Sequence, residues 1–140
     1  MTITIQRSIW INAPRERVWP ALIDPVELGK WWEPNEWTIV EAVVGGTVKF
    51  GFGEDTALAT ITALESEREL TLEWEPNTMF PTTMTSTLRL EDENGGTRVT
   101  ALETGFEGLP EDTRQTLIQG NEEGYEAVLR ALKDLIERSQ

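Results

Sequence analysis

Apolar residues near the C-terminal end of the chain recur at three- and four-residue intervals, between Pro110 and Arg138. This spacing places side chains on one face of an α-helix. Pro110 and the two acidic residues after it are typical of a helix start, because proline fits the first turn and carboxylates there interact well with the helix dipole. The sequence therefore predicts one long amphipathic helix over residues 110–138. Its expected apolar face consists of Leu117, Ile118, Asn121, Tyr125, Val128, Leu129, Leu132, Leu135 and Ile136.

Two glycines, Gly120 and Gly124, interrupt this helical pattern. Each glycine inside a helix costs about 1 kcal/mol relative to alanine. Two of them one turn apart indicate either a close approach of another backbone or space left open beside the helix.

The N-terminal part of the chain predicts a strand followed by two short helices. Residues 3–11 alternate well enough to form the strand, with isoleucines on one side. A short helix is expected after it, and Pro20 must shorten or kink that helix. Asp24, a typical N-cap residue before Pro25, begins a second short helix that runs towards Trp31.

The sequence pattern in the middle of the chain predicts short strands joined by tight turns. The clearest turn signals are the Gly45-Gly46 pair and Asn94-Gly95, the strongest two-residue hairpin signal in the chain. Leu70, Leu72 and Trp74 alternate with polar residues and are expected to point inward. The predicted strands cover about residues 37–43, 47–52, 56–64, 70–75, 82–90 and 97–106.

This order of elements predicts an α+β fold in a single domain, residues 1–140. About seven antiparallel strands form a sheet with one apolar face, which must be buried. The C-terminal helix carries the only apolar stripe long enough to lie across that face. We therefore expect the sheet to curl around this helix.

Composition narrows the chemistry. The chain has no cysteine and no histidine, which excludes disulfides and both Ser-His-Asp and Cys-His nucleophilic mechanisms. No spacing of carboxylates resembles a calcium loop, so no metal or other cofactor is expected.

Charge and hydropathy bear on partners and location. The formal net charge of -13 repels phosphate backbones and anionic membrane surfaces, so no nucleic acid partner is expected. The acidic residues are interpreted as a solvated surface, with a basic protein partner as the alternative. The sequence contains no run of about 18 apolar residues and no signal peptide pattern. A cytoplasmic protein without a membrane span is expected.

Several segments resemble a known superfamily. They are IWINAPRERVWPALIDPVELGKWW, the Gly46 hairpin, TRVTALETGF and GYEAVLRALKDLIER. Together they resemble the START-like (SRPBCC) superfamily, and more narrowly the family named after the activator of the heat-shock chaperone Hsp90 ATPase. The resemblance covers essentially the whole chain. It implies a helix-grip fold, in which a curved antiparallel sheet surrounds a long C-terminal helix and a deep cavity lies between them. The chain departs from the family pattern at Pro20, and at Tyr125, where many relatives carry tryptophan.

Helix phase and strand alternation select candidate ligand-binding residues for such a cavity. The alternative is that these residues simply fill a closed core. Of Trp31 and Trp32, adjacent at a helix end, one should be buried while the other lines the mouth of the pocket or a surface patch. The apolar candidates are Trp31, Trp32, Phe50, Phe52, Trp74, Met79, Phe80, Met84, Phe106, Tyr125 and Leu129.

The polar candidates are Glu103, Asn121 and the hydroxyl of Tyr125. If Glu103 faces the concave side of the sheet, it is a carboxyl group in an apolar pocket and its pKa is raised. The solvent-facing register is equally allowed by the alternation.

Three functions remain open at this stage. The first is a module that binds a hydrophobic or aromatic small molecule. The second is a co-chaperone-like partner that stimulates a chaperone ATPase, as the family name suggests. The third is an enzyme of the cyclase or dehydratase type, with Tyr125 or Glu103 as the acid.

Overall fold

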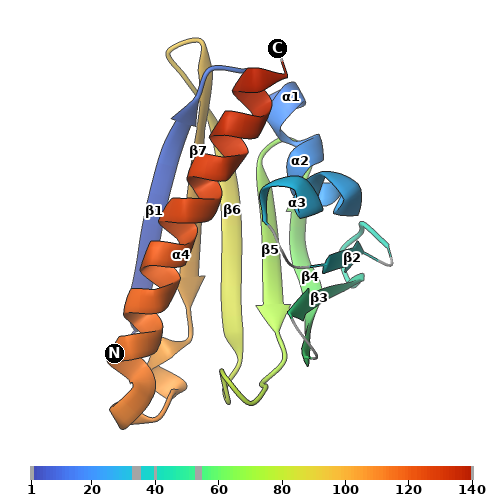
Figure 1. The fold of residues 1–140 in the computed structure, drawn as a ribbon. Helices are drawn as coiled ribbons and strands as arrows, with labels where there is room; N and C mark the ends of the chain where they lie inside the picture. Colours follow the sequence, from blue (N-terminus) through green and yellow to red (C-terminus); the bar gives the residue numbers. More distant parts are fainter. Residues whose placement is uncertain (1, 33–35, 40, 53–54, 140) are drawn as a thin grey trace.

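The computed structural model describes residues 2–32, 36–39, 41–52 and 55–139, except for the side chains of Glu36, Phe52 and Asp55. Within these ranges the chain forms a seven-stranded sheet and a long C-terminal helix (Figure 1). Three short helices follow the first strand, and a short 3-10 helix precedes the long helix. The strands are β1 (Thr4–Ile11), β2 (Glu36–Ile39), β3 (Thr47–Phe52), β4 (Asp55–Glu65), β5 (Glu69–Trp74), β6 (Met84–Glu93) and β7 (Gly96–Thr104). The helices are α1 (Arg15–Val18), α2 (Pro20–Ile23), α3 (Pro25–Trp31), the 3-10 helix η1 (Phe106–Gly108) and α4 (Glu111–Arg138).

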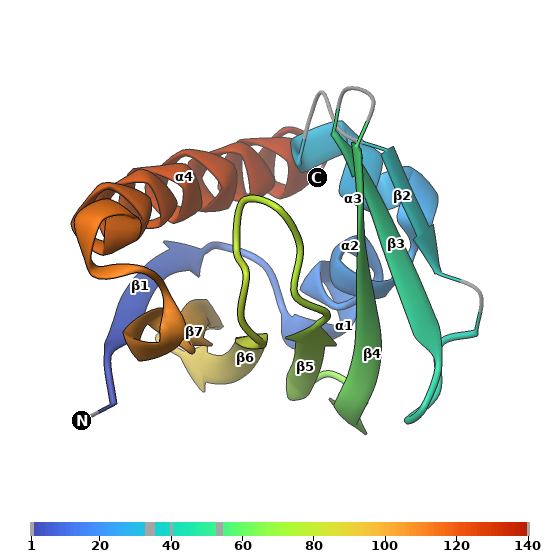
Figure 2. The same cartoon turned by 90° about the horizontal axis from the view of Figure 1, so that it is seen from below.

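The sheet is an antiparallel meander with the order β1-β7-β6-β5-β4-β3-β2. Seen from below in Figure 2, it curves from β1 to β2, with α4 across its open side. The Asn94-Gly95 turn joins β6 to β7, and both residues have positive φ angles, 47° and 79°. Positive φ at both central positions is the signature of the hairpin turn that suits twisted strands. The predicted hairpin, the α+β class and the helix-grip arrangement are therefore confirmed.

The strand predicted over residues 37–43 is too long, because β2 ends at Ile39. The chain from Glu41 to Gly46 turns instead. The backbone N–H groups of Val43 and Gly46 donate to carbonyls two and three residues earlier. Such local hydrogen bonds replace the ladder that a continued strand would need.

The first helical segment breaks where proline requires it. Pro20 begins α2, so the predicted short helix is divided into two pieces of one turn each. Asp24 caps α3 as predicted, since its side chain accepts a hydrogen bond from the backbone N–H of Val26 at 3.0 Å. Glu27 does not complete a capping box and forms an ion pair with Lys30 instead.

Helix α4 has two differently packed halves. In its C-terminal half, Leu129, Leu132 and Ile136 pack into the hydrophobic core, and all three are nearly fully buried. A guanidinium nitrogen of Arg17, on α1, also donates to the carbonyl of Ile136 and to the Ser139 hydroxyl. The N-terminal half carries the two glycines and faces a cavity. No helix in the described part of the chain is both long and apolar enough to cross a bilayer.

Candidate functional site

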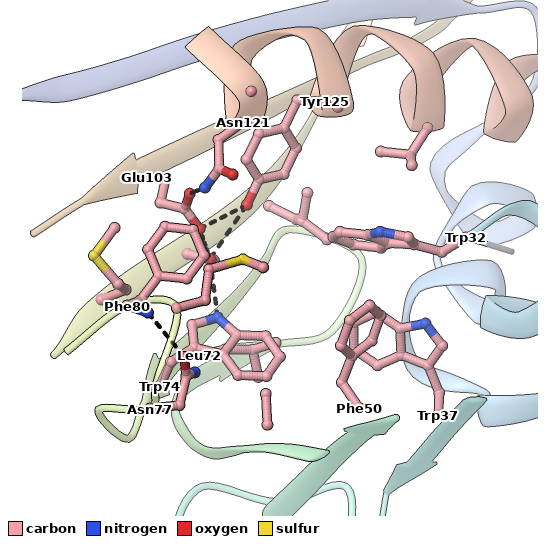
Figure 3. Close-up of a pocket in the computed structure, with 18 of the residues that line it drawn as sticks. Trp32, Trp37, Phe50, Leu72, Trp74, Asn77, Phe80, Glu103, Asn121 and Tyr125 are labelled. Atoms are coloured by element: carbon pink, nitrogen blue, oxygen red, sulfur yellow. Dashed lines mark hydrogen bonds between the residues drawn. The ribbon is translucent and has the colours of Figure 1, made fainter. Parts of the chain in front are cut away.

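A cavity of about 280 Å³ lies between the middle of α4 and strands β2 to β7 (Figure 3). It is lined mainly by aromatic and aliphatic side chains, with polar groups gathered at one end. Its lining residues are Trp32, Trp37, Phe50, Ala57, Leu70, Leu72, Trp74, Asn77, Met79, Phe80, Met84, Ser86, Leu88, Glu103, Gly120, Asn121, Gly124, Tyr125 and Val128.

One wall of the cavity is a cluster of aromatic rings. Trp37, from β2, lies edge-on to Phe50, from β3, with ring centroids 4.5 Å apart. Trp32, just after α3, lies 4.9 Å from Trp37 and 6.0 Å from Tyr125 on α4. Trp74 completes the cluster from β5, 6.2 Å from Phe50. These centroid distances lie in the favourable range for aromatic pairs, so the rings form a continuous apolar surface.

The opposite end of the cavity is a polar cluster centred on Glu103 of β7 (Figure 3). The Ser86 hydroxyl, from β6, donates to Oε2 of Glu103 at 2.6 Å, and the Tyr125 hydroxyl lies 3.1 Å from the same oxygen. The Asn121 amide donates to Oε1. Ser86 in turn accepts from the indole N–H of Trp74 at 3.0 Å. Side chains from β5, β6 and α4 thus hold the carboxyl group in place.

Burial controls the protonation of this cluster. It raises the pKa of Glu103, and the hydrogen bonds from Ser86, Asn121 and Tyr125 only partly oppose it. Burial, together with the charge of Glu103, raises the pKa of Tyr125 well above its ordinary value, so Tyr125 keeps its proton and acts as a donor. In its protonated form the carboxyl group of Glu103 can donate as well as accept a hydrogen bond. The expectation that Glu103 is a carboxyl group in an apolar pocket is confirmed.

The two helix glycines border open space. A Cβ atom added to Gly120 or Gly124 would have no neighbour within 4 Å, and both residues line the cavity. Of the two explanations that the sequence allowed, space left beside the helix is the correct one.

Replacing either glycine by alanine is expected to raise the free energy of unfolding by about 0.5 to 1 kcal/mol. Alanine restricts the unfolded chain and favours the helix, and at Gly120 and Gly124 its methyl group meets nothing. Urea unfolding of Gly120→Ala and Gly124→Ala measures the effect. A loss of stability in both variants would show that another group occupies this space.

Nine of the candidate ligand-binding residues line the cavity: Trp32, Phe50, Trp74, Met79, Phe80, Met84, Glu103, Asn121 and Tyr125. Trp31, Phe106 and Leu129 do not line it. All three are buried in the hydrophobic core, where the indole N–H of Trp31 donates to the carbonyl of Ala21 at 2.8 Å. The side chain of Phe52 lies outside the described residues.

Several lining residues were not identified as candidates from the sequence. Ser86 and Leu88 follow Met84 at alternating positions of β6, so the same alternation that selected Met84 points to them. Trp37 begins a predicted strand and could have been found in the same way. Its indole N–H is buried and has no partner in the part of the chain that the structure describes. The described residues contain no group of three or more carboxylates placed to hold a metal ion.

A curved antiparallel sheet around a long C-terminal helix defines this molecule as a helix-grip protein, the fold of START-like ligand-binding domains. The model of the family described as "Activator of Hsp90 ATPase homolog 1-like protein" matches residues 12–137. The chain belongs to this family.

Solved structures with the same fold align with this chain over almost the full length of both proteins. A protein of Mesorhizobium loti is 21% identical with a TM-score of 0.79, over 100% of this chain and 99% of its own. The Aha1 dimer of Colwellia psychrerythraea is 24% identical with a TM-score of 0.76, over 96% of each chain. A protein of Staphylococcus saprophyticus is 26% identical with a TM-score of 0.74, over 98% of this chain and 93% of its own. The search of curated proteins gave no match.

Proposed function

We propose that this protein binds a hydrophobic or aromatic small molecule in the cavity between the sheet and α4. The observation that carries the proposal is the cavity itself, which has an aromatic wall and a polar cluster centred on Glu103. A concave apolar pocket with a few convergent polar groups is the usual form of a small-molecule site. The aromatic wall would supply burial and ring contacts, and the Glu103 cluster would orient the ligand.

The glycines of α4 support the same proposal. Each lowers the stability of a helix that is otherwise well formed, and neither is needed for close packing. What they provide is room beside the helix, at the place where a ligand would lie.

The size of the cavity limits the ligand. About 280 Å³ is near the lower end of the range for small-molecule pockets, roughly 300 to 1,000 Å³. The proposed ligand is therefore a compact molecule of about two or three rings rather than a long lipid chain.

Native mass spectrometry of the protein purified from its own host tests the proposal directly. A discrete mass adduct is expected, and extraction would then identify the chemical class. A protein without an adduct, together with no saturable quenching of tryptophan fluorescence across a broad panel of aromatic compounds, would contradict the proposal. The stimulation of a chaperone ATPase, which the family name suggests, would then be measured in its place.

Gly124→Leu is expected to lower the affinity for the bound compound about tenfold or more, because Gly124 lines the cavity and a leucine there would take up part of the open space beside it. Titration of tryptophan fluorescence measures the change. Gly29→Leu is the matched control, since Gly29 is also a helical glycine with nothing within 4 Å but does not line the cavity. Equal affinities for the Gly124→Leu and Gly29→Leu variants would place the ligand elsewhere.

A further inference from the structure

We propose that the ligand of this cavity is a cationic amine: a compact apolar or aromatic body with one protonated nitrogen that pairs with the carboxylate of Glu103. The inference rests on the proposed function and specifies the ligand class for the same site.

The first argument is that Glu103 is a buried acid without a counter-ion. Its exposed fraction is 6%. No lysine or arginine of the described residues lines the cavity. Arg7, on the neighbouring strand β1, is bound at the surface by Glu122 and Glu126 instead. Because buried charges in proteins are normally paired, this acid lacks the partner that a cationic ligand would bring.

The groups that face Glu103 are neutral on every side. Ile5 of β1 and Ser86 of β6 are its cross-strand neighbours. Asn121 and Tyr125 reach it from α4, and Tyr125 is the only other titratable group among these contacts. All the hydrogen bonds run from neutral donors to the carboxyl oxygens, an arrangement that suits the ionised form once a positive charge is present.

The carboxylate of Glu103 has acceptor capacity left for the ammonium group of the ligand. A carboxylate offers about four acceptor sites. Among the described residues, Oε2 receives Ser86 and Tyr125, whereas Oε1 receives only Asn121. An ammonium group can therefore add a hydrogen bond without displacing a donor.

The rest of the molecule favours a cation over an anion. The formal net charge of -13 raises the local concentration of cations and repels carboxylates. From Glu103, the cavity leads to the rings of Trp74, Phe50 and Trp32, where the body of the ligand would lie (Figure 3). An alkylammonium group attached to an aromatic ring system would thus satisfy both ends of the cavity.

Three probes that share the same naphthyl body test this inference: 2-naphthylmethylamine, 2-naphthylmethanol and 2-naphthoate. Isothermal titration calorimetry on the full chain is expected to show the amine binding about tenfold or more tightly than the alcohol, and the carboxylate most weakly. In Glu103→Gln the affinity for the amine is expected to fall about tenfold or more, with the alcohol changed by less than about threefold. Glu103→Asp keeps the charge and should keep part of the preference for the amine.

Proton release provides a second readout. Burial raises the pKa of Glu103. Below that pKa the carboxyl group is protonated, and it releases its proton when it pairs with the ammonium group of the ligand. The affinity for the amine should therefore rise as pH increases through the pKa of Glu103, while the alcohol shows no such rise. At a pH below the pKa of Glu103, titrations in two buffers with different ionisation heats should detect proton release for the amine alone, and none in Glu103→Gln.

The outcomes separate the two proposals. If neutral aromatic compounds bind as well as the amine or better, or if Glu103→Gln, checked by thermal unfolding, keeps the full preference for the amine, the cationic ligand is ruled out and the proposed function stands. If no aromatic compound of any charge binds and the protein from its own host carries no mass adduct, both fall.

Discussion

Replacement of Phe106 by alanine is expected to lower the free energy of unfolding by about 3 to 5 kcal/mol. Phe106 has no exposed surface and is one of the largest fully buried side chains of the protein. It begins η1, the segment that leads from β7 towards α4, so the core closes around it at the junction of sheet and helix. Truncation removes the ring and leaves a void that the surrounding strands cannot fill, which is the costliest type of core substitution.

A second phenylalanine provides the control for this prediction. Phe80 is half-buried and lines the cavity rather than the closed core. Phe80→Ala should cost less than about 1.5 kcal/mol, because part of its surface is already exposed, yet it should weaken ligand binding. Urea unfolding with linear extrapolation measures both variants. Equal losses of stability would contradict the division between core and cavity described above.

Local signals in the sequence predicted the elements well. The long helix, the break at Pro20, the Asp24 cap and the Asn94-Gly95 hairpin each depend on a few neighbouring residues. Their physical causes, which are side-chain period, proline geometry and positive φ, act over one or two turns of chain. For this reason they can be recognised without knowledge of the tertiary structure.

The division of one face into core and cavity could not be predicted in this way. Tyr125 and Leu129 lie one helical turn apart on the same face of α4, and both are buried. Of the two, Tyr125 lines the cavity, whereas Leu129 packs in the hydrophobic core and does not line it. Helix phase identifies the inward face, but the distance to the opposite wall is a property of the whole fold.

The position of Glu103 shows the same limit. Alternation along β7 allows either face of the strand, and a shift of one residue would turn the carboxyl group outward. The choice is made by pairing, which places Glu103 opposite Ile5 on one side and Ser86 on the other. The Asn94-Gly95 turn fixes the register with Ser86, 17 positions away, but no local pattern reveals the pairing with Ile5, 98 positions away.

Replacement of Gly105 by alanine is expected to lower the free energy of unfolding by about 2 to 4 kcal/mol. Its φ angle is +115°, where a side chain is strained, and an added Cβ would lie 2.5 Å from the backbone carbonyl oxygen of Thr83. The same Cβ would lie 3.0 Å from the sulfur of Met84, which lines the cavity. Either the loop before β6 or the chain leading from β7 to α4 must move.

A matched glycine separates the strain from the steric clash. Gly95 also has a positive φ, +79°, but a Cβ there has no neighbour within 4 Å. Gly95→Ala should therefore cost only about 1 kcal/mol, the conformational part alone. Because Gly105 lies two residues after Glu103, its alanine variant should also weaken the binding of any compound oriented by that carboxyl group, whereas Gly95→Ala should not. Equal effects of the two substitutions on unfolding and binding would show that the junction between β7 and α4 adapts, and that the cavity does not depend on the close approach at Gly105.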